Sequence, residues 1–282
     1  MIVACQHRLV LCTPQRAQQP VTGVTLMRWN PQQYAKFHNE RSQPFFDLLT
    51  RVGGDPKTIY DLGCGDGRLT KELLTYWPDA HVTGIDLSAE MIEQANSIDH
   101  DSRLSFRRAD ITDFAPAEPV DLIVSNAVFQ WIPDHLSIIE RLTSHLSDAG
   151  TIAFQVPDNS TAASHRLIDS LIESPQWHAQ LRKLESHPSV PLSLESYAEH
   201  LLHLGLHVIA WETTYLHILN SPNAIVEWMK GTTLLPILNL LNEAAQARFL
   251  SEYMDLLSAT YLQYDFGVFF PFRRLFCIAS RI

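Results

Sequence analysis

Three aspartates and one glycine-rich loop are the residues whose types and spacing point most directly to chemistry. The loop reads Asp61-Leu62-Gly63-Cys64-Gly65-Asp66-Gly67, and the other two acids are Asp86 and Asp110. Each acid stands at the end of a short β-rich stretch. Glycines let a backbone adopt positive φ and approach a ligand closely, while carboxylates accept hydrogen bonds from amines and hydroxyls. Together these residues predict a site for a ligand that carries such donors.

The loop fits a diphosphate poorly. A dinucleotide-binding loop of the type G-x-G-x-x-G would place its third glycine where this chain has Arg68. Asp61 would repel a pyrophosphate, but it can accept a hydrogen bond from an ammonium group. Asp86 can accept from both hydroxyls of a ribose, and Asp110 from the exocyclic amine of an adenine. A ligand with an ammonium group, a ribose, an adenine and no phosphate is S-adenosylmethionine, so the residues predict this cofactor and disfavour a dehydrogenase.

Regular elements must position these acids, and the chain from about residue 45 to 156 alternates β-rich with helical stretches. Strands are expected at 58–62, 81–86, 104–110, 120–125 and 150–156, and helices at 68–76, 89–96 and 136–146. Strands separated by single helices indicate βαβ crossovers and a parallel sheet. Taken alone, the loop is a common turn and each acid a common helix cap. In register with three strands, the acids are expected to meet at the carboxyl edge of the sheet, where ligands bind.

After Pro157 long helical stretches alternate with two late strands, at 207–219 and 274–280. Helices inserted between late strands of such a sheet are expected to form a lid over its carboxyl edge. The chain is therefore divided into a disordered extension, a cofactor-binding core, and a lid and substrate region that includes the last strands. The expected bounds of these three parts are 1–26, 27–158 and 159–282.

Composition excludes several classes of protein. Of the 282 residues 46% are hydrophobic, enough for a packed core, and the net charge of -10 argues against a partner with a phosphate backbone such as a nucleic acid. No apolar run approaches the ~18 residues that cross a membrane. The four cysteines form no C-x-x-C pair, which predicts a reducing, cytoplasmic location without disulfides. No metal site is expected, and the oligomeric state stays open.

The motifs together resemble the class I S-adenosylmethionine-dependent methyltransferases. The resemblance is carried by Asp61–Gly67, Gly84-Ile85-Asp86, Ala109-Asp110 and Ser125-Asn126-Ala127. It implies an α/β fold with a seven-stranded, mostly parallel, doubly wound Rossmann-like sheet and an antiparallel last strand. It also implies a set of cofactor-binding residues: Asp61, Gly63, Cys64, Gly65, Asp86, Leu87, Asp110, Ile111, Asn126, Gln130 and Trp131.

Within that family Gln130-Trp131, at the expected start of a helix, resembles two groups: the trans-aconitate methyltransferases and the enzymes that esterify malonyl-carrier protein in biotin synthesis. The first group matches nearly the whole chain after residue 27. Its landmarks here are Trp29-Asn30-Pro31, Gln155–Asn159, Thr213-Thr214-Tyr215-x-His217, Trp228 and Arg274-Leu275-Phe276. One position departs, because Leu235 stands where that group tends to carry an arginine that would help hold a polycarboxylate.

A carboxylate acceptor would need little from the protein. It is already ionised at neutral pH, so no general base and no catalytic side chain are expected. It does need local cations, and the expected substrate-binding residues are Arg41, Tyr34, Tyr215, His217 and Arg274. Arg273 and Arg274 are neighbours on a strand and should face opposite sides, so at most one of them reaches the pocket. The resemblance to the family places Arg274 at that position. The sequence thus predicts an O-methyltransferase for a small polycarboxylic acid, most closely trans-aconitate. A malonyl-carrier-protein methyltransferase and a non-catalytic S-adenosylmethionine-binding protein are the alternatives.

Overall fold

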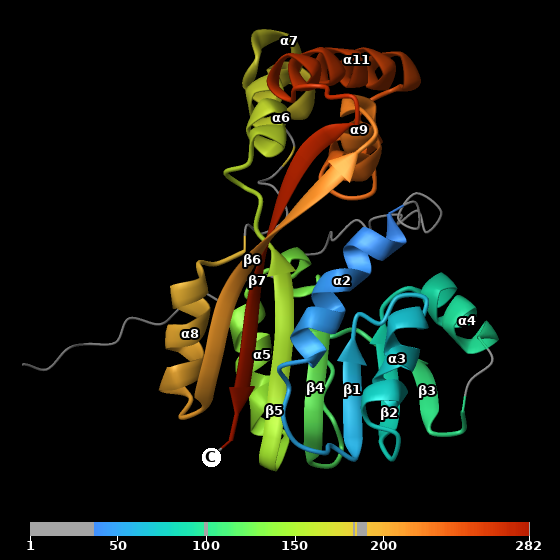
Figure 1. Ribbon diagram of the computed structural model, residues 1–282, viewed down its shortest axis with the longest axis vertical. Coiled ribbons are helices and arrows are strands. Elements are labelled where there is room, and N and C mark those ends of the chain that lie inside the picture. Colours follow the sequence, from blue (N-terminus) through green and yellow to red (C-terminus); the bar gives the residue numbers. More distant parts are fainter. Residues whose placement is uncertain (1–36, 99–100, 183, 185–190, 282) are drawn as a thin grey trace, which may run out of the picture.

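Short apolar stretches separated by single helices assemble into one sheet of seven strands (Figure 1). The computed structural model describes residues 37–98, 101–182, 184 and 191–281, so the expected extension at 1–26 lies outside it. In chain order the strands are β1 Thr58–Leu62, β2 His81–Asp86, β3 Leu104–Arg108, β4 Val120–Asn126, β5 Leu146–Pro157, β6 His207–Leu219 and β7 Val268–Ser280.

The strand order confirms the predicted sheet. It runs β3-β2-β1-β4-β5-β7-β6, and β1 to β5 pair in parallel. β7 lies antiparallel between β5 and β6. The order reverses direction at β1 and β4, so their carboxyl ends flank the switch point at which ligands bind in such sheets.

Three strand bounds differ from the prediction by more than one residue. β3 ends at Arg108 rather than Asp110, because the Asp110 carboxylate accepts a hydrogen bond from the backbone of Thr112 and turns the chain. β5 begins earlier, at Leu146. β7 begins six residues before Arg274, since its first half pairs with β6 alone.

Helices α3 Arg68–Tyr76, α4 Ala89–Ser97 and α5 His135–Ser144 follow the predicted positions within two residues. Ser88 caps α4, since its Oγ accepts from the N–H of Met91 at 3.3 Å. The first described helix, α2 His38–Leu49, is absent from the prediction, because Pro44 lies inside it and breaks the helical pattern. The later helices are α6 Ala163–Glu173, α7 Pro175–Leu181, α8 Leu194–His203, α9 Pro222–Lys230, α10 Leu234–Leu240 and α11 Glu243–Thr260.

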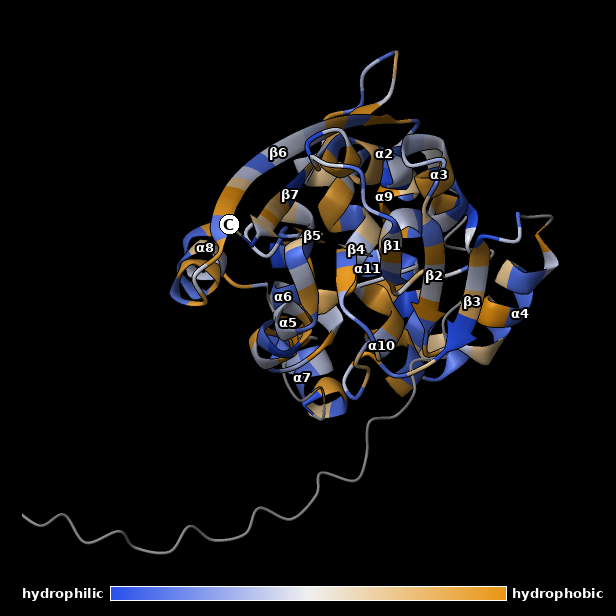
Figure 2. Cartoon of the chain, turned by 90° about the horizontal axis from the view of Figure 1, so that it is seen from below, coloured by the Kyte–Doolittle hydropathy of each residue, from blue (hydrophilic) through white to orange (hydrophobic). Residues whose placement is uncertain are grey.

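Two buried clusters sandwich the sheet. On one face α2 and α3 contribute Phe45, Leu48 and Leu73, and on the other α5 and α8 contribute Ile139 and Leu201. In Figure 2 the sheet accordingly lies between α2 and α3 on one side and α5 and α8 on the other. Sheet and helices therefore bury their apolar faces against each other.

A third cluster lies beyond the sheet, in a region here called the cap: α6, α7, α9, α10 and α11 with the outer halves of β6 and β7. Pairing of β7 with β5 stops at Pro157↔Arg274, whereas β6 and β7 continue alone to Leu219↔Val268. This two-stranded arm carries the cap helices above the carboxyl edge of the parallel strands (Figure 1). Trp177, Trp228 and Phe249 are at most 1% exposed in the cap's own core. None of the helices in the described ranges is long and apolar enough to cross a membrane.

Candidate functional site

The glycine-rich loop connects β1 to α3 at the carboxyl edge. Its backbone is fastened to β2, since the N–H groups of Gly63 and Cys64 donate to the carbonyl of Ile85 at 2.7 and 3.0 Å. Gly63 has φ of 77°, and a Cβ there would lie 2.2 Å from a methyl of Val128. A Cβ on Gly65, at φ 56°, would meet no atom within 4 Å. Gly65 therefore faces open space where a ligand can approach the backbone.

Asp86 is held beside that open space. One of its oxygens accepts from the N–H of Gly65 at 3.0 Å and the other from the N–H of Ser88 at 2.8 Å. Burial raises the pKa of Asp86, and these backbone donors act in the opposite direction. A carboxylate has about four acceptor positions, so two are left for a diol. The next residue, Leu87, is 42% exposed, so its apolar side chain is accessible for packing against an aromatic ring of a ligand.

Asp61 is a buried carboxylate beneath the loop, 3% exposed. Burial raises its pKa from 3.8 to about 7, a bond of 2.6 Å from the hydroxyl of Thr70 lowers it, and the charge of Asp86 raises it. An ammonium group nearby would stabilise the ionised form. Asp61 and Asp86 thus make the local potential negative, which suits a cationic ligand and opposes a phosphate.

Asp110 lies at the exposed rim. Its Oδ1 accepts from the backbone N–H and the hydroxyl of Thr112 at 2.8 and 2.7 Å. Ile111 is 7% exposed and packs in the core, while its carbonyl accepts from Arg141 at 2.9 Å. Asp61 and Asp86 therefore lie at the carboxyl ends of β1 and β2, whereas Asp110 stands two residues beyond the end of β3.

The end of β4 is a polar corner. Asn126 accepts from the side-chain amide of Gln155 at 2.5 Å, and Ala127 follows at φ 58°, a strained value for a residue with a Cβ. Gln130 donates to the carbonyl of Ala127 at 2.7 Å. The expected helix start at Gln130-Trp131 is a three-residue 3-10 helix, and α5 begins only after it. The strain at Ala127 marks this corner as a place where structure is shaped for a ligand.

Two of the predicted substrate residues are buried arginines. Arg41 and Arg274 are each 5% exposed. Arg41, on α2, donates to the carbonyl of Trp228 at 3.1 Å and lies 4.8 Å from the centre of that ring. Arg274, on β7, donates to the amide oxygen of Gln155 at 3.3 Å, which connects it to the corner at Asn126.

His217 packs against the aromatic rings of Trp228 and Phe272. Its ring centre is 4.9 Å from that of Trp228 and 6.3 Å from that of Phe272. The pKa of His217 is lowered from 6.5 to about 4, first by burial and then by the positive charges of Arg274 and Arg41, while Glu40 acts in the opposite direction. The imidazole is therefore neutral at pH 7 and senses a positive potential.

The remaining substrate candidates behave differently. The hydroxyl of Tyr215 donates to a carboxylate oxygen of Asp47 at 2.5 Å, so its polar end is already bonded within the protein. Tyr34 lies outside the described residues. Asp47 and Phe272 were missed by the sequence reasoning. Gln155 was named there only as part of the landmark Gln155–Asn159 and not as a site residue, although a glutamine inside the apolar stretch at 150–156 was a usable signal.

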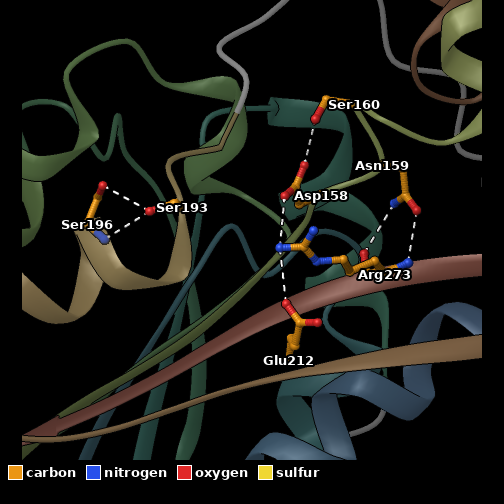
Figure 3. Close-up of polar contacts among 7 residues, drawn as sticks. All are labelled: Asp158, Asn159, Ser160, Ser193, Ser196, Glu212 and Arg273. Carbon is orange, nitrogen blue, oxygen red and sulfur yellow. Dashed lines mark hydrogen bonds and ion pairs between the residues drawn. The ribbon is translucent and has the colours of Figure 1, made fainter.

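Arg273 points away from this pocket, as expected from strand alternation. It forms ion pairs with Glu212 and Asp158 at 3.1 and 3.5 Å (Figure 3). Asn159 accepts from its backbone N–H and donates to its carbonyl, at 2.9 and 3.2 Å. These bonds fasten the end of β5 to the arm that carries the cap.

The described part of the chain holds two thiols, Cys64 and Cys277, both buried and free. Burial raises the pKa of each thiol above its ordinary value. Within the same ranges no three His, Cys, Asp or Glu side chains are grouped as metal ligands. The chemistry of this edge therefore rests on carboxylates at one end and guanidinium groups at the other.

Comparison with known proteins agrees with this geometry. A family model described as a methyltransferase domain matches residues 34–210. A trans-aconitate 2-methyltransferase of Streptomyces avermitilis is 40% identical over 260 residues, covering 90% of this chain and 97% of the relative. One of Mycolicibacterium gilvum is 40% identical over 254 residues, covering 89% and 98%.

Solved structures share the fold at low identity. The YcgJ protein of Bacillus subtilis matches with a TM-score of 0.53 and 13% identity over 84% of this chain and 97% of that chain. Phosphoethanolamine N-methyltransferase 2 of Haemonchus contortus, in complex with S-adenosyl-L-methionine, matches with a TM-score of 0.51 and 14% identity, over 88% and 56%. The chain therefore belongs to the class I S-adenosylmethionine-dependent methyltransferases, and within them to the family of the trans-aconitate 2-methyltransferases.

Proposed function

We propose that this methyltransferase esterifies one carboxylate of a small polycarboxylic acid, with trans-aconitate as the first candidate. The products are the monomethyl ester and S-adenosylhomocysteine. The relatives named above support the substrate, and the acidic charge of -10 supports a small molecule rather than a nucleic acid. The buried free thiols Cys64 and Cys277 suit a reducing, cytoplasmic location.

The observation that carries the proposal is the pair of buried arginines. Arg41 on α2 and Arg274 on β7 are both buried, and the positive charges of both lower the pKa of His217. A positive potential that arises inside a protein of net negative charge is suited to bind an anion. Guanidinium groups bind carboxylates in bidentate fashion, with stronger hydrogen bonds than neutral donors provide.

The cofactor site is proposed on the carboxylate side of the same edge. Asp61 would face the ammonium group, Asp86 the ribose and Asp110 the adenine, with Leu87 and Ile111 beside the base. Gly63, Cys64 and Gly65 would lie along the methionyl part, and Asn126, Gln130 and Trp131 near the sulfur. The open space at Gly65 and the exposed apolar Leu87 support this assignment. In this proposal residues 27–158 hold the cofactor, while 159–282 supply the lid and the last strands.

Little acid–base chemistry is required of the side chains. S-adenosylmethionine, when bound, supplies a methyl group on a positively charged sulfur, so the carboxylate gains a C–O bond as the C–S bond breaks and its electron pair stays on sulfur. Arg41 and Arg274 fix the acid, and the neutral His217 can donate one further hydrogen bond without adding a buried charge. The cap, with Trp228 and Phe272, excludes water from the reacting groups. Such positioning can contribute about 7–11 kcal/mol to the barrier reduction.

A panel of acids tests the proposal directly. Purified protein is incubated with methyl-labelled cofactor and trans-aconitate, cis-aconitate, citrate, tricarballylate or a monocarboxylic acid. We expect labelled, base-labile methyl ester with a polycarboxylic acid, and the preference within the panel identifies the acid. Label that is stable to base, or none with any acid, contradicts the carboxylate assignment. Label transferred only to a malonylated carrier protein would favour that alternative.

A further inference from the structure

Helix α2 carries one of the two buried arginines, and its two halves are held in different ways. The second half packs Phe45, Leu48 and Leu49 against the sheet, each at most 1% exposed. The first half reaches the cap, where Arg41 bonds the carbonyl of Trp228. Figure 1 shows α2 extending from the sheet toward the cap. The helix thus connects the two parts of the molecule that enclose the site.

Pro44 separates these halves. A proline has no N–H, so the carbonyl of Glu40 cannot receive the helical hydrogen bond from position 44. The backbone of α2 is therefore weakest within one turn of Arg41. The direction of the Arg41 side chain depends on contacts other than the backbone hydrogen bonds.

Asp47 supplies two such contacts from the anchored half. Its Oδ1 accepts from the side-chain amide of Gln43 at 2.8 Å, a bond that spans Pro44. Its Oδ2 accepts from the hydroxyl of Tyr215 at 2.5 Å, a bond that fixes α2 to β6. The carboxylate of Asp47 therefore connects the two halves of α2 and also binds the helix to the sheet.

The hydrogen bond from Tyr215 to Asp47 is also part of a series of contacts that leads back to Arg41. The ring of Tyr215 is stacked on that of His217, with centres 6.3 Å apart and planes 10° from parallel. The ring of His217 packs on Trp228 at 4.9 Å, and Arg41 lies over Trp228. The chain of contacts thus begins and ends on α2. Asp47 connects this helix to β6, and Arg41 connects it to α9.

From this geometry we infer that Asp47 is a positioning residue of the substrate pocket: by holding Gln43 and Tyr215 it fixes the first half of α2 so that Arg41 faces the acid. Asp47 acts through Arg41 rather than on the substrate. The inference rests on the proposed function only for the identity of the ligand. The placement of Arg41 can be measured without any substrate.

The first test therefore uses phenylglyoxal, which modifies accessible guanidinium groups, with peptide mass spectrometry as the readout. In Asp47→Ala we expect Arg41 to be modified about tenfold faster than in the wild type, since its burial depends on the hydrogen bonds of Asp47. Arg274 is an internal control, because it is equally buried but lies on β7. Tyr215→Phe and Gln43→Ala, which each remove one arm, should give smaller increases at Arg41. Unchanged modification of Arg41 in Asp47→Ala overturns the inference, and so does an equal increase at Arg274.

The second test is kinetic. Asp47→Ala should raise KM for the acid about tenfold or more, because misplacement by about 1 Å can cost a hundredfold. Its Kd for S-adenosylhomocysteine should stay within about twofold of wild type, since the cofactor site lies on other elements. Asp47→Asn keeps only one of the two acceptor oxygens and should recover part of the loss, whereas Asp255→Ala, which changes an exposed acid on α11, should have no effect. An unchanged KM in a folded Asp47→Ala contradicts the inference. A wild type that esterifies no acid contradicts the proposed function instead, and the modification rates still decide the role of Asp47.

Discussion

The proposed cofactor edge and the proposed substrate pocket are built in opposite ways. The cofactor edge takes Asp61, Asp86 and Asp110 from three consecutive strand ends, each followed by its own helix or turn. The substrate pocket takes Arg41 from α2 and Arg274 from β7, which are more than two hundred positions apart in the chain. The first region is determined by local motifs, whereas the second exists only after the cap and α2 have packed.

The two regions also differ in the sign of their electrostatic potential. The buried carboxyl group of Asp61 and the half-buried one of Asp86 dominate the cofactor edge. Asp86 raises the pKa of Asp61, and both acids raise the pKa of the Cys64 thiol. Two buried guanidinium groups dominate the pocket and lower the pKa of His217. A cationic methyl donor and an anionic acceptor would thus each meet a surface of opposite charge. Variants that weaken one region should therefore spare the other.

The largest effect is expected for Asp86→Ala. It removes the acceptor of the Gly65 and Ser88 N–H groups and the proposed ribose contacts, a loss of about 3 kcal/mol or roughly a hundredfold in affinity. Calorimetry with S-adenosylhomocysteine measures it. Asp66→Ala is the matched control, because Asp66 lies in the same loop but pairs with Arg68. If both variants weaken binding equally, the cofactor edge is wrongly assigned.

Arg274→Gln should reduce kcat/KM for the acid by about 30-fold, since one charge-assisted contact contributes about 2 kcal/mol. Binding of S-adenosylhomocysteine should stay unchanged. Arg273→Gln is the control on the same strand, where the side chain pairs with Glu212 and Asp158 on the other side (Figure 3). A larger loss in Arg273→Gln than in Arg274→Gln would reverse the assignment of the two faces of β7.

Binding of S-adenosylhomocysteine should strengthen about tenfold between pH 5.5 and 7.5. Asp61 has its pKa raised to about 7, so it is mostly protonated at the lower pH and mostly ionised at the higher one. Only the ionised form attracts the ammonium group. Calorimetry at both pH values gives the slope, and Asp61→Asn should flatten it. An Asp61→Asn protein with the full slope would show that another group titrates.

The smallest effect concerns stability. The pKa of His217 is lowered from 6.5 to about 4 in the folded chain, so between these values the unfolded chain holds a proton that the folded chain lacks. Lowering the pH from 7 to 5 should therefore destabilise the wild type more than His217→Gln, by about 1 kcal/mol. Urea unfolding at both pH values measures the difference. The exposed His203→Gln serves as the control, and an equal response in all three proteins would contradict the burial of a neutral imidazole.

Much of the cofactor edge was predictable, because the hydrophobic periodicity of its strands and helices and the glycine-rich motif indicate the same structure. The strands at 58–62 and 81–86 and the helix at 68–76 have the predicted bounds. A strand end and the turn after it depend on residues that are near each other in the chain, so the local sequence determines them. Asp110 shows the limit, since its own side-chain turn ends β3 two residues early.

For the proposed substrate pocket, individual residues were predicted but their arrangement was not. Resemblance pointed to Arg41, His217 and Arg274, but not to the contacts that place them. Asp47 carries no motif, and α2 was not predicted at all because Pro44 interrupts its pattern. The bonded state of the Tyr215 hydroxyl likewise depends on a helix that is remote in the chain. Such contacts follow from packing and leave no periodic signal.

The sequence by itself determined the parallel sheet, the glycine-rich loop and the three acids, because β-strand period, glycine conformation and carboxylate chemistry all act over a few residues. Only the tertiary structure decided which cations are buried together. That required the arm of β6 and β7 to carry the cap over the edge and α2 to cross between the two parts. Burial is a property of the assembled chain, so the same arginine is a surface charge or an anion-binding group according to what packs around it.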